Sequence, residues 1–281
     1  MADGAYRWQG HAPAPDAARV EAIDAAYDEA QAHAFAEPAR AAAVERIGQA
    51  LAAARAGDLA GAADQLNRVR SILEGLNPAA LEPRRGLAGL FDSRGERLKA
   101  FRDSFRRAST ALSEAAADLT GRVEEAARRS GALDTVWADM RDAMVELDAH
   151  LLTAARRLSG HQPAEDAPPH PLEARKVSLD ACRAAAIGAL PLIRGAQNAD
   201  ARAAEALKTC GDGMTAWRQD WSEALGLAGK RPKKVRPDRE RLLHARDALL
   251  GRIDRALAEL TAARARRAGI EARLSDLRAP L

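Results

Sequence analysis

Apolar residues recur along much of the chain at alternating spacings of three and four, the pattern of helices that bury one seam. The first seam consists of Leu98, Phe101, Phe105, Ala108, Leu112, Ala115 and Leu119. It predicts a long helix that runs to about Arg129 and is broken by Ser130 and Gly131. The most regular seam follows: Leu133, Trp137, Met140, Met144, Leu147, Leu151, Ala154 and Leu158. We therefore expect two long helices between Ser93 and Leu158.

The same spacing continues towards the C-terminus. One seam contains Leu179, Cys182, Ala186 and Ile193, and it resumes with Leu207, Cys210, Met214, Trp217, Trp221 and Leu225. Pro191 lies between the two parts and is expected to kink or divide the helix, because proline lacks the amide hydrogen. A last helix, capped by Asp238, carries Leu250, Ile253, Leu257, Leu260, Ile270, Leu274 and Leu277.

The remaining segments set the expected domain organisation. Residues 1–16 lack periodicity and predict a flexible N-terminal arm, and residues 17–75 predict a unit of three short helices. Residues 76–281 predict a long helical bundle with loops near 159–171 and 226–237. The fold class is thus all-α, an elongated antiparallel bundle with coiled-coil-like long helices. Its core is expected to include Phe101, Phe105, Trp137, Met144, Leu147, Trp217 and Trp221.

The amino-acid composition narrows the possible fold classes further. Apolar residues make up 47% of the 281 positions, but aromatic residues only 4%, and much of the rest is alanine. This composition is typical of helices and argues against a β-sandwich or a doubly wound α/β enzyme. The net charge of +3 is too small to require a nucleic-acid partner. The first residues predict no secretory signal, and no stretch predicts a transmembrane segment, so we expect a cytoplasmic protein.

Two groups of residues are candidates for chemistry on the long helices. Asp142, Glu146 and His150 follow each other at intervals of four, which places carboxylates and an imidazole on one helix face as metal ligands require. The heptad puts Asp142 and Glu146 outside the seam, so a solvated charged face is the favoured interpretation. Cys182 and Cys210 fall on seams and are interpreted as packing groups rather than redox centres. The sequence contains no Gly-rich phosphate loop, nucleophile elbow or HExxH motif, and we expect neither a cofactor nor an enzymatic activity.

One connector concentrates positive charge. It contains Lys230, Arg231, Lys233, Lys234 and Arg236, between Gly229 and Pro237. These cations are candidates for contact with an anion or with the phosphates of nucleic acid or anionic lipid. No aromatic residue is interleaved to stack a base, and the prolines keep the segment from forming one helical stripe. A solvated loop is therefore the favoured interpretation, and peripheral membrane contact stays open.

Several segments resemble the TelA family of toxic-anion (tellurite) resistance proteins. Near the start of the bundle these are Leu76-Asn77-Pro78, Gly89-Leu90-Phe91 and Leu98-Lys99-Ala100-Phe101. Later ones are Leu147-Asp148-x-x-Leu151 and the stretch from Val177-Ser178-Leu179 to Leu192-Ile193-Arg194-Gly195-Ala196-Gln197-Asn198. The resemblance covers about residues 75–200, and beyond Asn198 the chain departs from the family pattern. It implies a cytoplasmic, mostly helical protein linked to resistance against tellurite and other stresses.

Three functions follow as hypotheses. The first is a non-enzymatic helical interaction protein that acts in a stress response through protein partners. The second is a binder of nucleic acid or of an anionic membrane surface through the connector at 229–237. The third is a thiol- or metal-dependent enzyme that detoxifies an oxyanion. The helical seams and the lack of catalytic motifs favour the first hypothesis.

Overall fold

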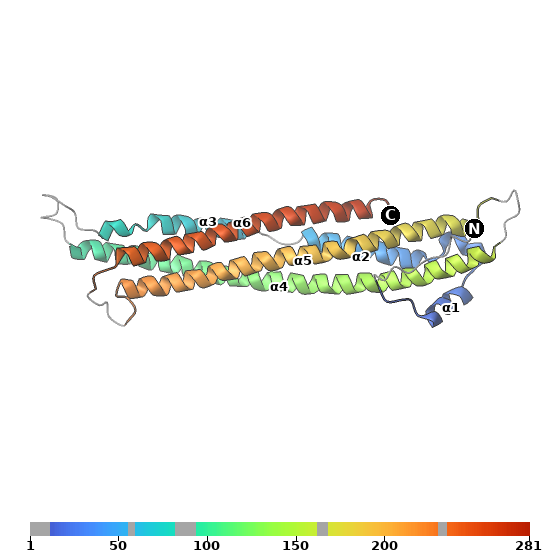
Figure 1. Cartoon of the computed structure of the whole chain (residues 1–281), viewed down its shortest axis with the longest axis horizontal. Coiled ribbons are helices and arrows are strands. Elements are labelled where there is room, and N and C mark those ends of the chain that lie inside the picture. Colours follow the sequence, from blue (N-terminus) through green and yellow to red (C-terminus); the bar gives the residue numbers. More distant parts are fainter. Residues whose placement is uncertain (1–11, 56–59, 82–93, 162–167, 230–234) are drawn as a thin grey trace. The chain divides into compact units, whose positions relative to one another are not determined.

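The computed structural model describes residues 12–55, 60–81, 94–161, 168–229 and 235–281 (Figure 1). These residues form helices and no strand. The α-helices are α1 (Ala17–Ala25), α2 (Glu37–Arg55), α3 (Ala60–Gly75), α4 (Arg94–Gly160), α5 (Pro171–Ala224) and α6 (Arg239–Arg278), and the 3-10 helices are η1 (Glu29–Ala34) and η2 (Pro78–Leu81). The all-α helical bundle predicted from the seams is confirmed. Helix α4 ends at Gly160 and α5 begins at Pro171, and α5 ends at Ala224 before α6 begins at Arg239.

The chain divides into two compact units. The first contains α1, α2, α4 from Arg129 onward, α5 up to Asn198 and the end of α6 from Arg266. The second contains α3, the preceding part of α4, the following part of α5 and most of α6. Of the three short helices that the sequence analysis grouped together, α1 and α2 belong to the first unit and α3 to the second.

Contacts within each unit show that α4 and α5 are antiparallel. In the second unit, Arg102 of α4 bonds to Leu225 of α5, and Arg218, further back along α5, bonds to Ser109, further along α4. In the first unit, Asp134 of α4 pairs with Arg194 and Asp148 pairs with Arg183, so the numbers again run in opposite directions. The antiparallel arrangement is therefore present in both units.

The core of each unit is built from the predicted seams. Six of the seven expected core residues are buried; they are Phe101, Phe105, Met144, Leu147, Trp217 and Trp221. Trp137 is the exception, because it is only partly buried. Its ring lies against the guanidinium groups of Arg141 and Arg194, whose Cζ atoms are 4.9 and 4.3 Å from the ring centroid. The prediction that Trp137 is a core residue is wrong, and the two arginines explain how its ring is covered.

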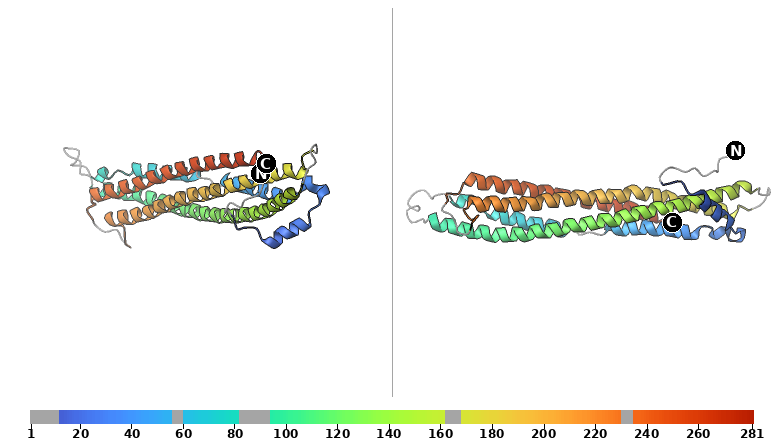
Figure 2. Two further views of the ribbon diagram at one scale, coloured as in Figure 1. Left: turned by 45° about the vertical axis from the view of Figure 1, so that its right-hand side comes forward. Right: turned by 90° about the horizontal axis from the view of Figure 1, so that it is seen from below.

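Two expected helix breaks are absent. Helix α4 runs through Ser130 and Gly131, and α5 runs through Pro191 without being divided (Figure 2). Pro191 is exposed, so its ring points away from the core, while Leu190 and Leu192 beside it are buried. The Ser130 carbonyl accepts a hydrogen bond of 2.9 Å from the side chain of Gln197. The prediction of a break at Ser130 and Gly131 is wrong, and Pro191 does not divide α5, because buried residues on both sides keep the backbone helical.

Arginine side chains satisfy carbonyl groups at the ends of several helices. Arg267, which is 6% exposed, donates to the carbonyls of Ala53 and Ala54 at the end of α2. Arg102 donates twice to the Leu225 carbonyl just after α5, at 2.9 and 2.7 Å. The last carbonyls of a helix have no intrahelical partner, so these contacts fix helix ends within each unit. Within the described ranges, no helix combines the length and apolar character needed to span a membrane.

Candidate functional site

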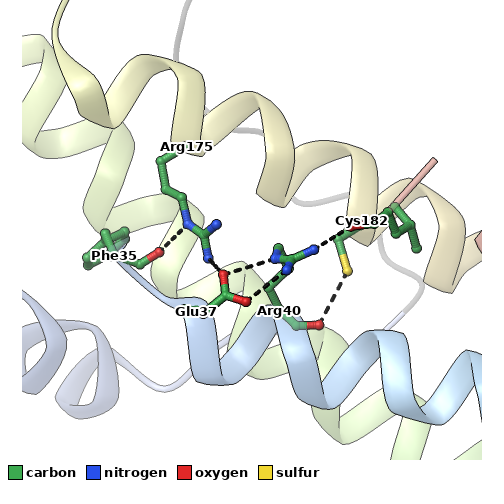
Figure 3. A network of polar contacts seen from close by, with 6 residues as sticks. Phe35, Glu37, Arg40, Arg175 and Cys182 are labelled. Atoms are coloured by element: carbon green, nitrogen blue, oxygen red, sulfur yellow. Dashed lines mark hydrogen bonds and ion pairs between the residues drawn. The ribbon is translucent and has the colours of Figure 1, made fainter. Parts of the chain in front are cut away.

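A polar network joins the start of α2 to the first turns of α5 in the first unit (Figure 3). Glu37, the first residue of α2, accepts hydrogen bonds from Arg40 one turn later, at 3.0 and 2.8 Å. The same carboxylate also accepts from Arg175 of α5. One carboxylate therefore holds two guanidinium groups from two different helices.

The backbone just before α2 is shaped by this network. Arg175 donates a second hydrogen bond, from Nε, to the carbonyl of Phe35 at 2.6 Å. Ala36 follows with a φ of 59°, in the left-handed region that side chains other than glycine rarely adopt. The surrounding contacts compensate for this strained conformation, because Arg175 binds the residue before Ala36 and the residue after it.

Cys182 lies on the other side of Arg40. Its thiol donates to the backbone carbonyl of Arg40 at a sulphur–oxygen distance of 3.8 Å, and the residue is fully buried. Burial raises the pKa of the Cys182 thiol, and the nearby charges of Arg40 and Arg175 offset only part of that effect. The thiol therefore stays protonated at neutral pH, the form that is neither a nucleophile nor a metal ligand.

Cys210 has the same character in the second unit. It is fully buried, and burial raises its pKa to about 11, with a smaller opposing effect from Arg252. The prediction that both cysteines lie in the core is confirmed. Both thiols have arginines nearby, but neither has the partial exposure of the reactive cysteines whose pKa is lowered.

The three candidate metal ligands of the sequence analysis lie on α4, and two of them contact residues outside that helix. Asp142 is exposed as expected, but Glu146 is partly covered because it accepts from Arg19 of α1, with Nε at 3.1 Å. His150 lies 2.8 Å from the Glu146 carbonyl through Nδ1, and its ring packs edge-on against Phe35. The part of the chain that the structure describes holds no group of three His, Cys, Asp or Glu residues with metal-site geometry. The sequence analysis missed the role of Glu146, which links α1 to α4.

The sequence analysis also missed a buried ion pair. Asp148 of α4 and Arg183 of α5 are both buried, and the guanidinium contacts both carboxylate oxygens, with Nη2 to Oδ2 at 3.3 Å. Each residue directly follows a seam residue, Leu147 or Cys182. This adjacency is the one signal in the sequence that places an acid and a base near the core. A pair of this kind fixes how two helices align more than it adds stability.

Most of the basic connector lies outside the residues that the structure describes. Lys230, Arg231, Lys233 and Lys234 lie outside the described residues, and Arg236 is exposed. Their predicted contact with an anion or with phosphates therefore stays a prediction.

Comparison of the chain with protein-family models, with curated proteins and with solved structures finds no match.

Acidification is expected to loosen the start of α2. Hydrogen bonds from Arg40 and Arg175 lower the pKa of Glu37 from 4.5 to about 2. A carboxylate with a lowered pKa stabilises the folded state above its unfolded pKa, and this stabilisation is lost as the pH falls through the folded value. The Glu37→Gln variant should therefore lose less stability than the native chain between about pH 4.5 and pH 2. Thermal unfolding followed by circular dichroism across this range measures the difference.

The matched control for this experiment is Glu45→Gln, which changes an exposed carboxylate on the same helix. It should keep the native pH profile. Equal acid sensitivity of the native chain and Glu37→Gln would contradict the role given to Glu37.

Both thiols are expected to be unreactive in the native protein. Because Cys182 and Cys210 are buried and their pKa values are raised, a thiol reagent such as DTNB should modify neither below the unfolding transition and both in concentrated urea. The double variant Cys182→Ser/Cys210→Ser should unfold at lower urea, since each hydroxyl is buried at an apolar seam. Rapid modification of either thiol by DTNB in native buffer would refute the prediction that both are unreactive.

Proposed function

We propose that the chain is a non-enzymatic helical interaction protein that acts inside the cell, through protein partners, in a stress response of the kind that the TelA resemblance implies. The observation that carries this proposal is that the chemically active side chains make contacts within the helical bundle. Cys182, Glu146 and Asp148 all hold helices together through the contacts described above. Residues that an oxyanion-detoxifying enzyme would keep accessible are thus committed to the architecture.

The chemistry of thiols favours a scaffold over a thiol-dependent enzyme. Reduction or sequestration of an oxyanion by a cysteine needs a thiolate that the substrate can reach. Both thiols are buried and have raised pKa values. A helical bundle with long α4, α5 and α6 instead offers extended surface on which a partner can bind.

The test combines a phenotype with a turnover assay. Deletion of the gene in its native cell should increase sensitivity to tellurite, and expression of the native chain should restore resistance. The double variant Cys182→Ser/Cys210→Ser should restore it equally at a temperature where circular dichroism shows it folded. Purified protein with tellurite and a reductant should consume no more tellurite than buffer. Multiple turnovers by the native chain that are lost in the double variant would overturn the proposal in favour of an enzyme.

A capture experiment addresses the partner. The tagged native chain, purified from the stressed cell, should retain a protein partner. The double cysteine variant should retain the same partner. Recovery of no partner under stress, with resistance intact, would contradict an action through protein partners.

A further inference from the structure

A groove runs between α5 and α6 in the second unit, and it is lined by more positive than negative charge. It encloses about 410 Å³ and lies between Arg202 and Thr209 of α5 on one side and Arg252 and Arg255 of α6 on the other. The small side chains of Ala206 and Ala256 line it between them and leave the space open. Two carboxylates, Glu205 and Glu259, complete the lining, so arginines outnumber acids by three to two.

Most of the other arginines that the structure describes have a polar partner, and these three do not. No hydrogen bond or ion pair joins Arg202, Arg252 or Arg255 to any residue in the described ranges. The acid next to Arg255 in sequence, Asp254, is already paired with Arg70 of α3 at 2.6 Å. Arg241, nearer the start of α6, is by contrast held by Asp220. The guanidinium groups at the groove therefore keep their donors available.

Arg252 also lies close to the backbone of α5. A Cβ atom at Gly213 would lie 2.8 Å from both Cδ and Nη1 of Arg252, which is closer than van der Waals contact allows. Glycine in a helix interior costs about 1 kcal/mol relative to alanine, and at Gly213 it leaves the space that the Arg252 side chain occupies. The absent side chain lets Arg252 lie directly against α5. The positive charge of Arg252 also acts on the Cys210 thiol, where it opposes the increase in pKa that burial causes.

We propose that this groove binds a phosphate group. The planar guanidinium fork matches the oxygens of a tetrahedral oxyanion, and its charge-assisted hydrogen bonds are among the strongest that a side chain makes. Thr209 supplies a hydroxyl donor at the same groove, and Ala206 and Ala256 leave room for the group that carries the phosphate. A phosphate at a soluble metabolite and one at a lipid headgroup share this chemistry. The site is independent of the proposed scaffold function.

The test uses the full chain at low ionic strength and two probes. Isothermal titration calorimetry measures binding of inorganic phosphate against chloride at equal ionic strength. Co-sedimentation measures binding to phosphatidylcholine vesicles with and without phosphatidic acid. Saturable binding of inorganic phosphate supports the site with a soluble ligand. Binding only to vesicles that contain phosphatidic acid supports it with a lipid headgroup. Binding to neither probe overturns the proposal.

Two variants locate the binding. The double variant Arg252→Gln/Arg255→Gln should weaken the affinity by about tenfold or more, because two charge-assisted contacts are lost. Gly213→Ala should also weaken it without changing the net charge, because the added methyl group displaces Arg252. The control is Arg264→Gln, which removes one exposed cation from the same helix. Circular dichroism checks that each variant is folded, and equal affinity in Arg264→Gln and the double variant would overturn the proposal.

Discussion

Replacement of Asp148 by alanine is expected to lower the free energy of unfolding by about 3 to 5 kcal/mol. The reason is that Arg183 would keep its buried position between α4 and α5 but lose the Asp148 carboxylate that its Nε and Nη2 contact. A buried charge without its partner is far more costly than the pair itself is stabilising. Urea denaturation followed by circular dichroism at 222 nm, a standard helix signal, measures the loss.

Two controls separate the ion pair from a general effect of mutating α4. Asp142→Ala removes an exposed carboxylate from the same helix and should change stability by no more than about 0.5 kcal/mol. The double variant Asp148→Leu/Arg183→Met replaces both charges with apolar groups, and it should be more stable than Asp148→Ala. A loss below about 1 kcal/mol for Asp148→Ala would show that the pair is not buried as described.

The seams were predictable because their signal is local and repeated. Residues such as Leu112, Met144 and Ile193 return to one face every three or four positions, and all three are buried. The break at Ser130 and Gly131 was predicted wrongly because a local penalty of about 1 kcal/mol for glycine competes with burial of Leu133 and Met140 beyond it. Pro191 carries a larger penalty, about 3 kcal/mol, but Leu190 and Ile193 beside it are buried.

The polar contacts were less predictable because their partners lie far apart in sequence. The burial of Cys182 follows from its place on a seam, but the contact of its thiol with Arg40 spans 142 positions. Glu37 and Arg175 are 138 positions apart, and nothing in the sequence around either residue identifies the other. Charge patterns along one helix reveal neighbours three or four residues away, not partners on another helix. The network in the first unit therefore became visible only with the fold.

The second large effect is expected at Trp221, whose replacement by alanine should cost about 3 to 5 kcal/mol. Trp221 is fully buried in the second unit, and its ring packs against Phe101, Phe105 and Trp217 at centroid distances of 5.8, 6.0 and 4.7 Å. Its indole Nε1 also donates to the carbonyl of Leu242 at 3.2 Å, which ties α5 to α6. Alanine would leave a large cavity among these rings and would remove the hydrogen bond that ties α5 to α6.

Two further variants test whether burial causes this loss. Trp221→Phe keeps most of the ring and loses the hydrogen bond to Leu242, so it should cost less than Trp221→Ala. Trp137→Ala removes the same side chain from a partly buried position, where Arg141 and Arg194 can close over the space that it leaves. Its cost should therefore be clearly smaller in the same urea titration. If Trp137→Ala proved as destabilising as Trp221→Ala, the deeper burial of Trp221 would not explain the size of its loss.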